Sequence, residues 1–76
     1  MAMMKAREMF AALGYRCIET GGFIWYINDS DNKEYRRIEF YFSDCTFLIA
    51  DGYEPIRINA KEFEAIQKQM EELRWV

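Results

Sequence analysis

The sequence predicts a single α+β domain spanning residues 1–76, in which an antiparallel β-meander of four or five strands packs against an N-terminal and a C-terminal helix. Apolar residues recur at helical spacing near both ends of the chain, and between those ends they alternate as in strands. The composition, 51% hydrophobic and 30% charged, is that of a globular chain rather than a disordered one. A chain of 76 residues has room for one small core.

Residues 2–13, AMMKAREMFAAL, are expected to form the first helix. Its apolar residues share one stripe, at Met3, Ala6, Met9, Phe10 and Leu13. Gly14 follows at the place where a left-handed C-terminal cap usually lies, because glycine adopts positive φ without strain.

The middle of the chain is expected to form the strands. The segments are YRCIET (15–20), FIWYIN (23–28), YRRIEFYFS (35–43), TFLIA (46–50) and a short PIRI (55–58). Two-residue hairpin turns are expected at residues 44–45 and 51–52. The second is the more favourable turn, since Gly52 accepts positive φ.

The second helix is expected to begin after Asn59, which acts as N-cap, with Glu62 completing a capping box. Its apolar stripe consists of Phe63, Ile66, Met70 and Leu73. Trp75 lies off that stripe, so it either folds back at the terminus or contacts another chain.

The turns decide which strand residues share a face of the sheet. Pairing Ser43 with Thr46 and placing Trp25 near Ile38 predicts one core face. It consists of Phe23, Trp25, Ile27, Ile38, Phe40, Phe42, Phe47, Ile49 and Ile56. The second face then consists of Ile24, Tyr26, Arg37, Glu39, Tyr41, Leu48, Ala50, Tyr53, Pro55 and Arg57.

That second face is richer in large apolar side chains than a solvated sheet face normally is. Tyrosine and arginine are also enriched in interface hot spots. The candidate interface or ligand-binding residues are Tyr26, Arg37, Tyr41, Leu48, Tyr53 and Arg57. Two structural interpretations remain open: Tyr–Arg neighbours are ordinary cross-strand stabilisers, and one helix could cover each face.

The leading functional hypothesis is a non-enzymatic interaction module that forms a homodimer or binds a host protein through this face. The alternative is a protein that binds a small nucleotide, because guanidinium groups suit phosphates and tyrosine rings stack on bases. RNA binding is a weaker alternative. A formal charge of −3 argues against a partner of duplex DNA.

Enzymatic motifs are scarce, and no catalytic residue, metal or cofactor is predicted. The chain has no histidine, no glycine-rich phosphate loop and no GxSxG. Cys17 and Cys45 lack CxxC spacing and are expected to be free thiols. Without a membrane-length apolar stretch or a signal-peptide pattern, the expected location is the cytoplasm, away from any membrane.

Two terminal segments, KAREMFAALGY (5–15) and AKEFEAIQKQMEELRW (60–75), resemble the ends of small uncharacterised proteins from prophages and mobile elements of Gram-positive bacteria. Those proteins run helix, strands, helix, and end in an EELGW-like segment, whose usual glycine is replaced here by Arg74. The resemblance covers about a third of the chain. It implies an α+β module and, by analogy, a host-interaction or counter-defence role, and it assigns no site residues.

Overall fold

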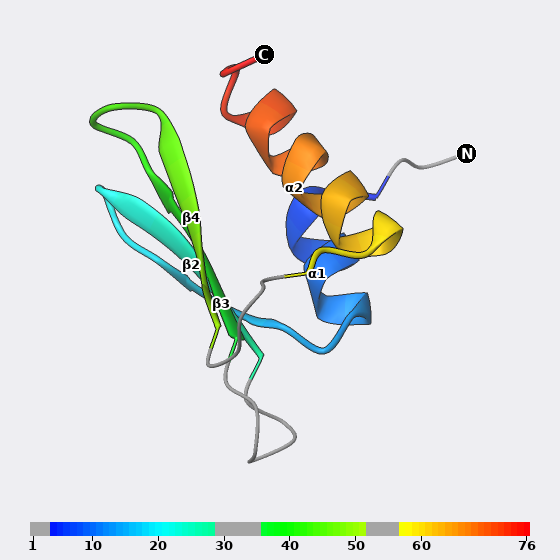
Figure 1. Cartoon of the computed structure of the whole chain (residues 1–76). Coiled ribbons are helices and arrows are strands. Elements are labelled where there is room, and N and C mark those ends of the chain that lie inside the picture. Colours follow the sequence, from blue (N-terminus) through cyan, green and yellow to red (C-terminus); the bar gives the residue numbers. More distant parts are fainter. Residues whose placement is uncertain (1–3, 29–35, 52–56) are drawn as a thin grey trace.

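A computed structural model describes residues 4–28, 36–51 and 57–76 of the chain. The elements are α1 (Ala6–Ala12), β1 (Arg16–Glu19), β2 (Phe23–Asn28), β3 (Arg36–Tyr41), β4 (Thr46–Asp51) and α2 (Ala60–Glu72). The strands form one antiparallel sheet in the order β1-β2-β3-β4, and both helices lie on the same side of it (Figure 1). The predicted α+β meander between two helices is confirmed, with four strands in the part of the chain that the structure describes.

Helix α1 begins at Ala6, later than predicted, because two carboxylates accept hydrogen bonds from amides at its start. The Lys5 amide donates to Glu8 Oε1 at 2.8 Å, and the Ala6 amide donates to Glu72 Oε2 at 2.7 Å. Amides at a helix start have no partner within the helix, so acceptors placed there determine where it begins. The second contact also joins the start of α1 to the end of α2.

The C-terminal end of α1 has the predicted glycine cap. Gly14 has φ of +93°, and the Tyr15 amide donates to the Phe10 carbonyl at 3.0 Å. This is the Schellman arrangement, which turns the chain sharply out of the helix. Tyr15 is thereby placed in the core, 6% exposed, at the entry to β1.

Helix α2 begins as predicted, but its buried stripe is rotated. The Asn59 side chain accepts from the Glu62 amide at 2.8 Å, and the Glu62 carboxylate accepts from the Asn59 amide at 3.1 Å. Glu62, Ala65, Ile66 and Gln69 are buried, whereas Phe63 is 56% exposed. The prediction of Phe63 in the apolar stripe is therefore wrong, because the Glu62 carboxylate takes the inward position.

Helix α2 ends as α1 does, although no glycine is present. Arg74 has φ of 62°, and the Trp75 amide donates to the Met70 carbonyl at 2.9 Å. The Trp75 ring then lies 6.1 Å from the Phe40 ring, between centroids. Of the two alternatives for Trp75, folding back is the one observed.

The hairpin between β3 and β4 differs from the prediction without changing the faces. Tyr41 pairs with Thr46 across a four-residue turn, and Phe40 pairs with Phe47. The register is shifted by two residues from the predicted one, and a shift of two leaves every side chain on its predicted side. Residues 57 and 58 of the predicted fifth strand are not in a strand. The predicted 51–52 turn and the start of that strand extend outside the described residues.

The register between β2 and β3 corrects the predicted faces. Tyr26 pairs with Ile38, and Ile24 pairs with Phe40. The predicted register, with Trp25 near Ile38, is off by one residue, so every β2 side chain lies on the face opposite to the predicted one. The assignment of Phe23, Trp25 and Ile27 to the core face, and of Ile24 and Tyr26 to the second face, is therefore wrong.

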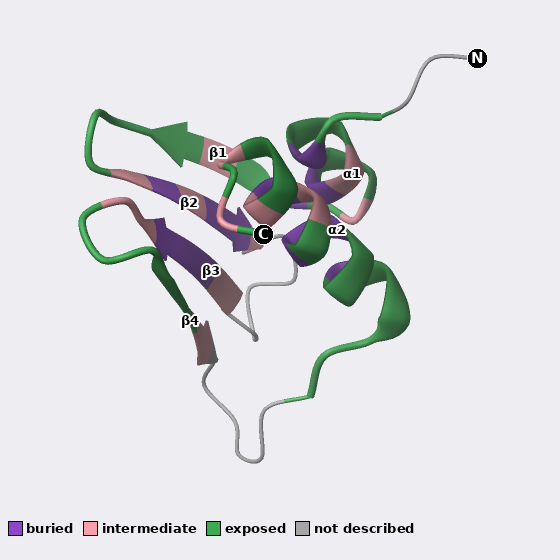
Figure 2. Cartoon of the chain, turned by 90° about the horizontal axis from the view of Figure 1, so that it is seen from above, coloured by how far each residue is buried: buried purple, intermediate pink, exposed green. Residues whose placement is uncertain are grey.

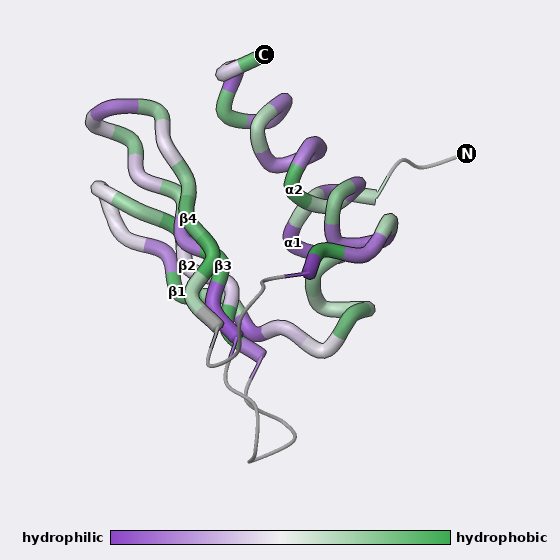
Figure 3. Tube along the Cα trace, viewed as in Figure 1, coloured by the Kyte–Doolittle hydropathy of each residue, from purple (hydrophilic) through white to green (hydrophobic). Residues whose placement is uncertain are grey.

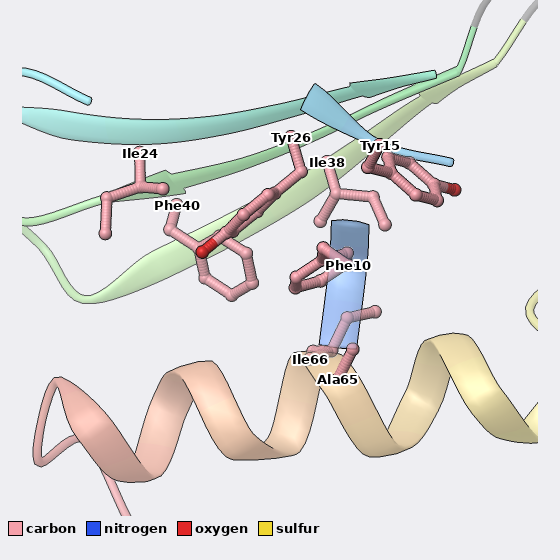
Figure 4. Packing of buried hydrophobic residues seen from close by; sticks show 8 residues of the cluster. All are labelled: Phe10, Tyr15, Ile24, Tyr26, Ile38, Phe40, Ala65 and Ile66. Atoms are coloured by element: carbon pink, nitrogen blue, oxygen red, sulfur yellow. The ribbon is translucent and has the colours of Figure 1, made fainter. Parts of the chain in front are cut away.

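The core lies between the sheet and the two helices, where buried strands and helix stripes face each other (Figure 2). It consists of Phe10, Tyr15, Ile24, Tyr26, Ile38, Phe40, Ala65 and Ile66. Figure 4 shows the rings from the sheet meeting Phe10 and the side chains of α2. The Phe10 and Tyr26 rings stack with centroids 3.9 Å apart, so α1 packs directly on β2.

Candidate functional site: the open face of the sheet

The side of the sheet opposite the helices is the candidate site, and we call it the open face. By strand register it consists of Arg16, Ile18, Phe23, Trp25, Ile27, Arg37, Glu39, Tyr41, Thr46, Leu48 and Ala50. Neither α1 nor α2 covers it (Figure 1). It is a mixed surface, in which aromatic and aliphatic side chains surround an arginine–glutamate pair.

Three of the predicted site residues, Arg37, Tyr41 and Leu48, lie together on the open face. Tyr26 does not, because it points to the helices and is 2% exposed. Its assignment to the same face was an error of register.

Arg57 lies in the exposed segment before α2, where its carbonyl accepts a hydrogen bond from Arg36 Nη2. Tyr53 lies outside the described residues. The structure therefore brings together half of the predicted constellation.

Trp25 is at the centre of the open face, on β2. Its ring stacks on Phe23, with centroids 4.7 Å apart and planes 27° apart. The Arg37 guanidinium carbon lies 4.8 Å from the centre of the Trp25 ring, a cation–π contact. Phe23 also lies against Tyr41, at 6.2 Å between ring centroids. These contacts place four large side chains in one continuous layer on the sheet.

Glu39 is the acidic group within that layer and is only 3% exposed. Its carboxylate accepts hydrogen bonds from Arg37 Nε and from the Tyr41 hydroxyl. The bond to Glu39 raises the pKa of the Tyr41 hydroxyl above its usual range, because it favours the protonated form. A buried carboxylate needs such donors, and Glu39 has them from its own strand.

This arrangement bears on the two functional hypotheses from the sequence. Arg37 directs its Nε to Glu39, so part of its guanidinium is engaged within the chain. Of the five residues expected to bind a nucleotide, Tyr26, Arg37, Tyr41, Tyr53 and Arg57, only Arg37 and Tyr41 are described on the open face. The nucleotide and RNA hypotheses stay predictions, and fewer of the residues they require are described on one face than the sequence predicted.

Apolar side chains are most exposed at the two edges of the sheet. Ile18 on β1 is 37% exposed and Leu48 on β4 is 45% exposed, and both belong to the open face. Phe47, next to Leu48 on β4, points to the helix side, where its ring lies 5.6 Å from Phe40, yet it remains 39% exposed. Both sides of β4 therefore present a large apolar group to solvent.

Sequence analysis missed Phe23 and Trp25 as surface residues. In FIWYIN, large apolar side chains occupy both the odd and the even positions, so alternation alone does not reveal which set faces the helices. One polar group distinguishes the two sets of side chains. The Tyr26 hydroxyl requires a hydrogen-bond partner when it is buried, and Gln69 on α2 accepts from it at 2.5 Å.

Groups suited to other chemistry are sparse in the part of the chain that the structure describes. There, no three His, Cys, Asp or Glu residues are grouped as a metal site requires. Cys17 is partly buried, which raises the pKa of its thiol, and Cys45 is exposed; both are free thiols. None of the described helices is long and apolar enough to cross a membrane.

Comparisons with protein-family models, with curated proteins and with solved structures give no match to this chain.

Proposed function

We propose that the chain is a non-enzymatic interaction module that self-associates through its β-sheet. The observation that carries the proposal is that both helices lie on one side of the sheet, although the sheet has large apolar side chains on both of its faces. Ile18 and Leu48 are more than a third exposed, and Phe23, Trp25 and Tyr41 are only partly buried.

Burial of exposed apolar side chains of the sheet stabilises such an assembly, and Leu48 on the open face and Phe47 on the helix side are 45% and 39% exposed. Complete burial of one large apolar side chain is worth about 1.5–3 kcal/mol relative to exposure. A domain of 76 residues buries a small core of its own, so contact with another molecule adds appreciably to its stability.

The charges favour a second copy as the occupant. The chain has a formal charge of −3, but the open face carries Arg16, Arg37 and Glu39 and therefore no excess of acidic groups. Arg37 and Glu39 compensate each other within the face. Two copies can therefore approach through their sheets without bringing an excess of carboxylates together.

Size-exclusion chromatography with light scattering tests the proposal. We expect the wild-type chain to be a dimer at high micromolar concentration and Leu48→Lys to be a monomer, because Leu48 contributes an exposed side chain to the sheet surface. Phe63→Lys is the matched control: it places the same charge at an exposed apolar residue of α2. A wild-type monomer at high micromolar concentration would overturn the proposal.

The origin in a mobile element and the cytoplasmic location stay predictions. The resemblance of the terminal segments supports the first, and it adds no residue to the proposed surface.

A further inference from the structure

Strand β4 exposes two consecutive large apolar residues. Phe47 is 39% exposed and Leu48 is 45% exposed. Because neighbours in a strand point to opposite faces, the first lies on the helix side and the second on the open face. A molecule lying flat on the open face would cover Leu48 and leave Phe47 in water. A strand added alongside β4, carrying its own side chains on both faces, would cover both.

The position of β4 makes such an addition possible. It is the last strand in the order β1-β2-β3-β4, so its outer side has no neighbouring strand in the sheet that the structure describes. Natural edge strands are usually protected against pairing by charged residues, proline or bulges. Residues 46–50 of β4, TFLIA, contain no charge and no proline, and Figure 3 shows hydrophobic residues along this strand.

The opposite edge is different and serves as an internal comparison. Strand β1 has four residues, and two of them, Arg16 and Glu19, are charged and exposed. Charge and shortness are the features that discourage pairing at an edge. The two edges of the same sheet therefore have opposite character, and only β4 is suited to accept a strand.

We propose that β4 pairs antiparallel with β4 of a second copy, so that four strands from each copy form one continuous sheet. This inference rests on the proposed self-association and assigns its contact to the β4 edge rather than to the centre of the open face. The sequence of β4 supports a second copy as the occupant, since an antiparallel pair of TFLIA segments brings uncharged and mostly apolar residues opposite one another.

Symmetry fixes the possible registers. A two-fold axis perpendicular to the sheet keeps the helices of both copies on one side, and directly opposed residues must share a face. One residue of β4 must therefore lie opposite itself. With Leu48 opposite Leu48 of the second copy, Phe47 lies opposite Ile49 and Thr46 opposite Ala50.

The neighbouring register is less favourable. With Ile49 opposite itself, Phe47 lies opposite position 51, so the uncharged residues 46–50 no longer pair only with one another. The register centred on Leu48 pairs the five uncharged residues 46–50 only with one another. We therefore assign the contact to this register.

Disulfide trapping tests the register directly. In a Cys45→Ser background, Leu48→Cys places two thiols opposite each other, at the Cβ separation of about 4.5–5.5 Å for cross-strand pairs, which is close enough to bridge with small adjustment. We expect Leu48→Cys to form a covalent dimer rapidly under mild oxidation. Tyr41→Cys in the same background, on the open face but on β3, is expected to form none.

Chromatography of charge variants provides the second readout. We expect Phe47→Lys to raise the Kd of the dimer at least about 100-fold, because two buried apolar contacts are lost and two charges are desolvated. Ile18→Lys, which places the same charge at an exposed open-face residue of β1, is expected to leave the dimer intact. Circular dichroism establishes that each variant is folded at the temperature used.

The outcomes separate the two proposals. A wild-type dimer that Ile18→Lys dissociates and Phe47→Lys does not, with trapping at position 41 and none at 48, overturns the β4 contact but leaves self-association through the sheet in place. A wild-type monomer overturns both. Trapping at position 48, together with dissociation by Phe47→Lys, supports both.

Discussion

The hydroxyl of Tyr26, on β2, donates a 2.5 Å hydrogen bond to Oε1 of Gln69, on α2. Both residues are buried, at 2% and 4% exposure. The bond joins the sheet to the C-terminal helix across the core and gives each polar group a partner away from water. A slip of β2 by one residue would remove the ring from beneath Phe10 and leave the Gln69 amide without this donor, so the contact stabilises the observed register.

Replacing Gln69 is therefore expected to destabilise the fold. We expect Gln69→Ala to lower the free energy of unfolding by about 1–3 kcal/mol, because the buried Tyr26 hydroxyl loses its acceptor. Gln67→Ala makes the same chemical change at an exposed position of the same helix and is expected to change stability by less than about 0.5 kcal/mol. Urea denaturation of both variants measures the difference, and equal effects would contradict the role of the bond.

Glu62 is expected to be the most sensitive polar residue of the core. Its carboxylate accepts from the Tyr15 hydroxyl at 2.5 Å and from the Asn59 amide at 3.1 Å, and it pairs with Arg36 at 3.0 Å. Removing one partner of a buried, hydrogen-bonded ion pair costs about 3 kcal/mol, which we expect for Glu62→Ala. Glu64→Ala, at an exposed position, is the control. Calorimetric unfolding that shows similar midpoints for the two variants would refute this ranking.

Arg74 adopts a backbone conformation that suits glycine better. Its φ of 62° costs a residue with a Cβ about 1 kcal/mol or more relative to glycine. We expect Arg74→Gly to raise the free energy of unfolding by about 1 kcal/mol, reduced somewhat by the greater freedom of glycine in the unfolded chain. Thermal denaturation measures the gain.

Gly14 provides the reverse substitution at the equivalent position of α1. A Cβ there would meet Asn28 Nδ2 at 3.5 Å, an ordinary contact, so Gly14→Ala tests the backbone conformation rather than crowding. We expect it to destabilise the fold by about 1 kcal/mol. If Arg74→Gly and Gly14→Ala shifted stability in the same direction, the left-handed caps would not explain either effect.

Stability is expected to fall at alkaline pH because of two buried tyrosines. Burial raises the pKa of the Tyr15 hydroxyl, and its bond to the Glu62 carboxylate raises it further. Burial also raises the pKa of Tyr26. Above a pH of about 10 the unfolded chain loses these protons while the folded chain keeps them, so unfolding becomes more favourable as pH rises.

Each such tyrosine contributes a slope of up to about 1.4 kcal/mol per pH unit between its unfolded and folded pKa values. Urea titrations at several alkaline pH values measure the slope, and Tyr26→Phe is expected to reduce it. A wild-type stability that is constant from neutral to strongly alkaline pH would contradict the prediction. Below the ordinary tyrosine pKa the folded and unfolded chains both keep these protons, so the two tyrosines are expected to leave the free energy of unfolding unchanged there.

The parts of the fold that depend on local rules were predictable from the sequence. The start of α2 follows from Asn59 and Glu62 at capping-box spacing, and the end of α1 follows from Gly14. The faces of β3 and β4 were also predicted, because the error in their turn was two residues, and an even shift preserves parity.

The orientation of β2 was not predictable by the same means. Large apolar residues occupy both of its faces, so the choice is made by tertiary contacts: Phe10 stacks on Tyr26, and Gln69 accepts its hydroxyl. The error in the β2 register also changes which residues were predicted for the candidate site. Arg37, Tyr41 and Leu48 were correctly placed on one face from the sequence, whereas Trp25, at the centre of that face, was assigned to the core.

The placement of the two tryptophans gives the chain a natural pair of optical probes. Trp25 is on the open face beside Arg37, and Trp75 packs against Phe40 on the helix side. Replacing either indole by phenylalanine leaves a single tryptophan, and its emission, excited at wavelengths that tyrosine does not absorb, describes only its own side of the sheet. Events on the two surfaces can thus be followed separately in solution without attaching a dye.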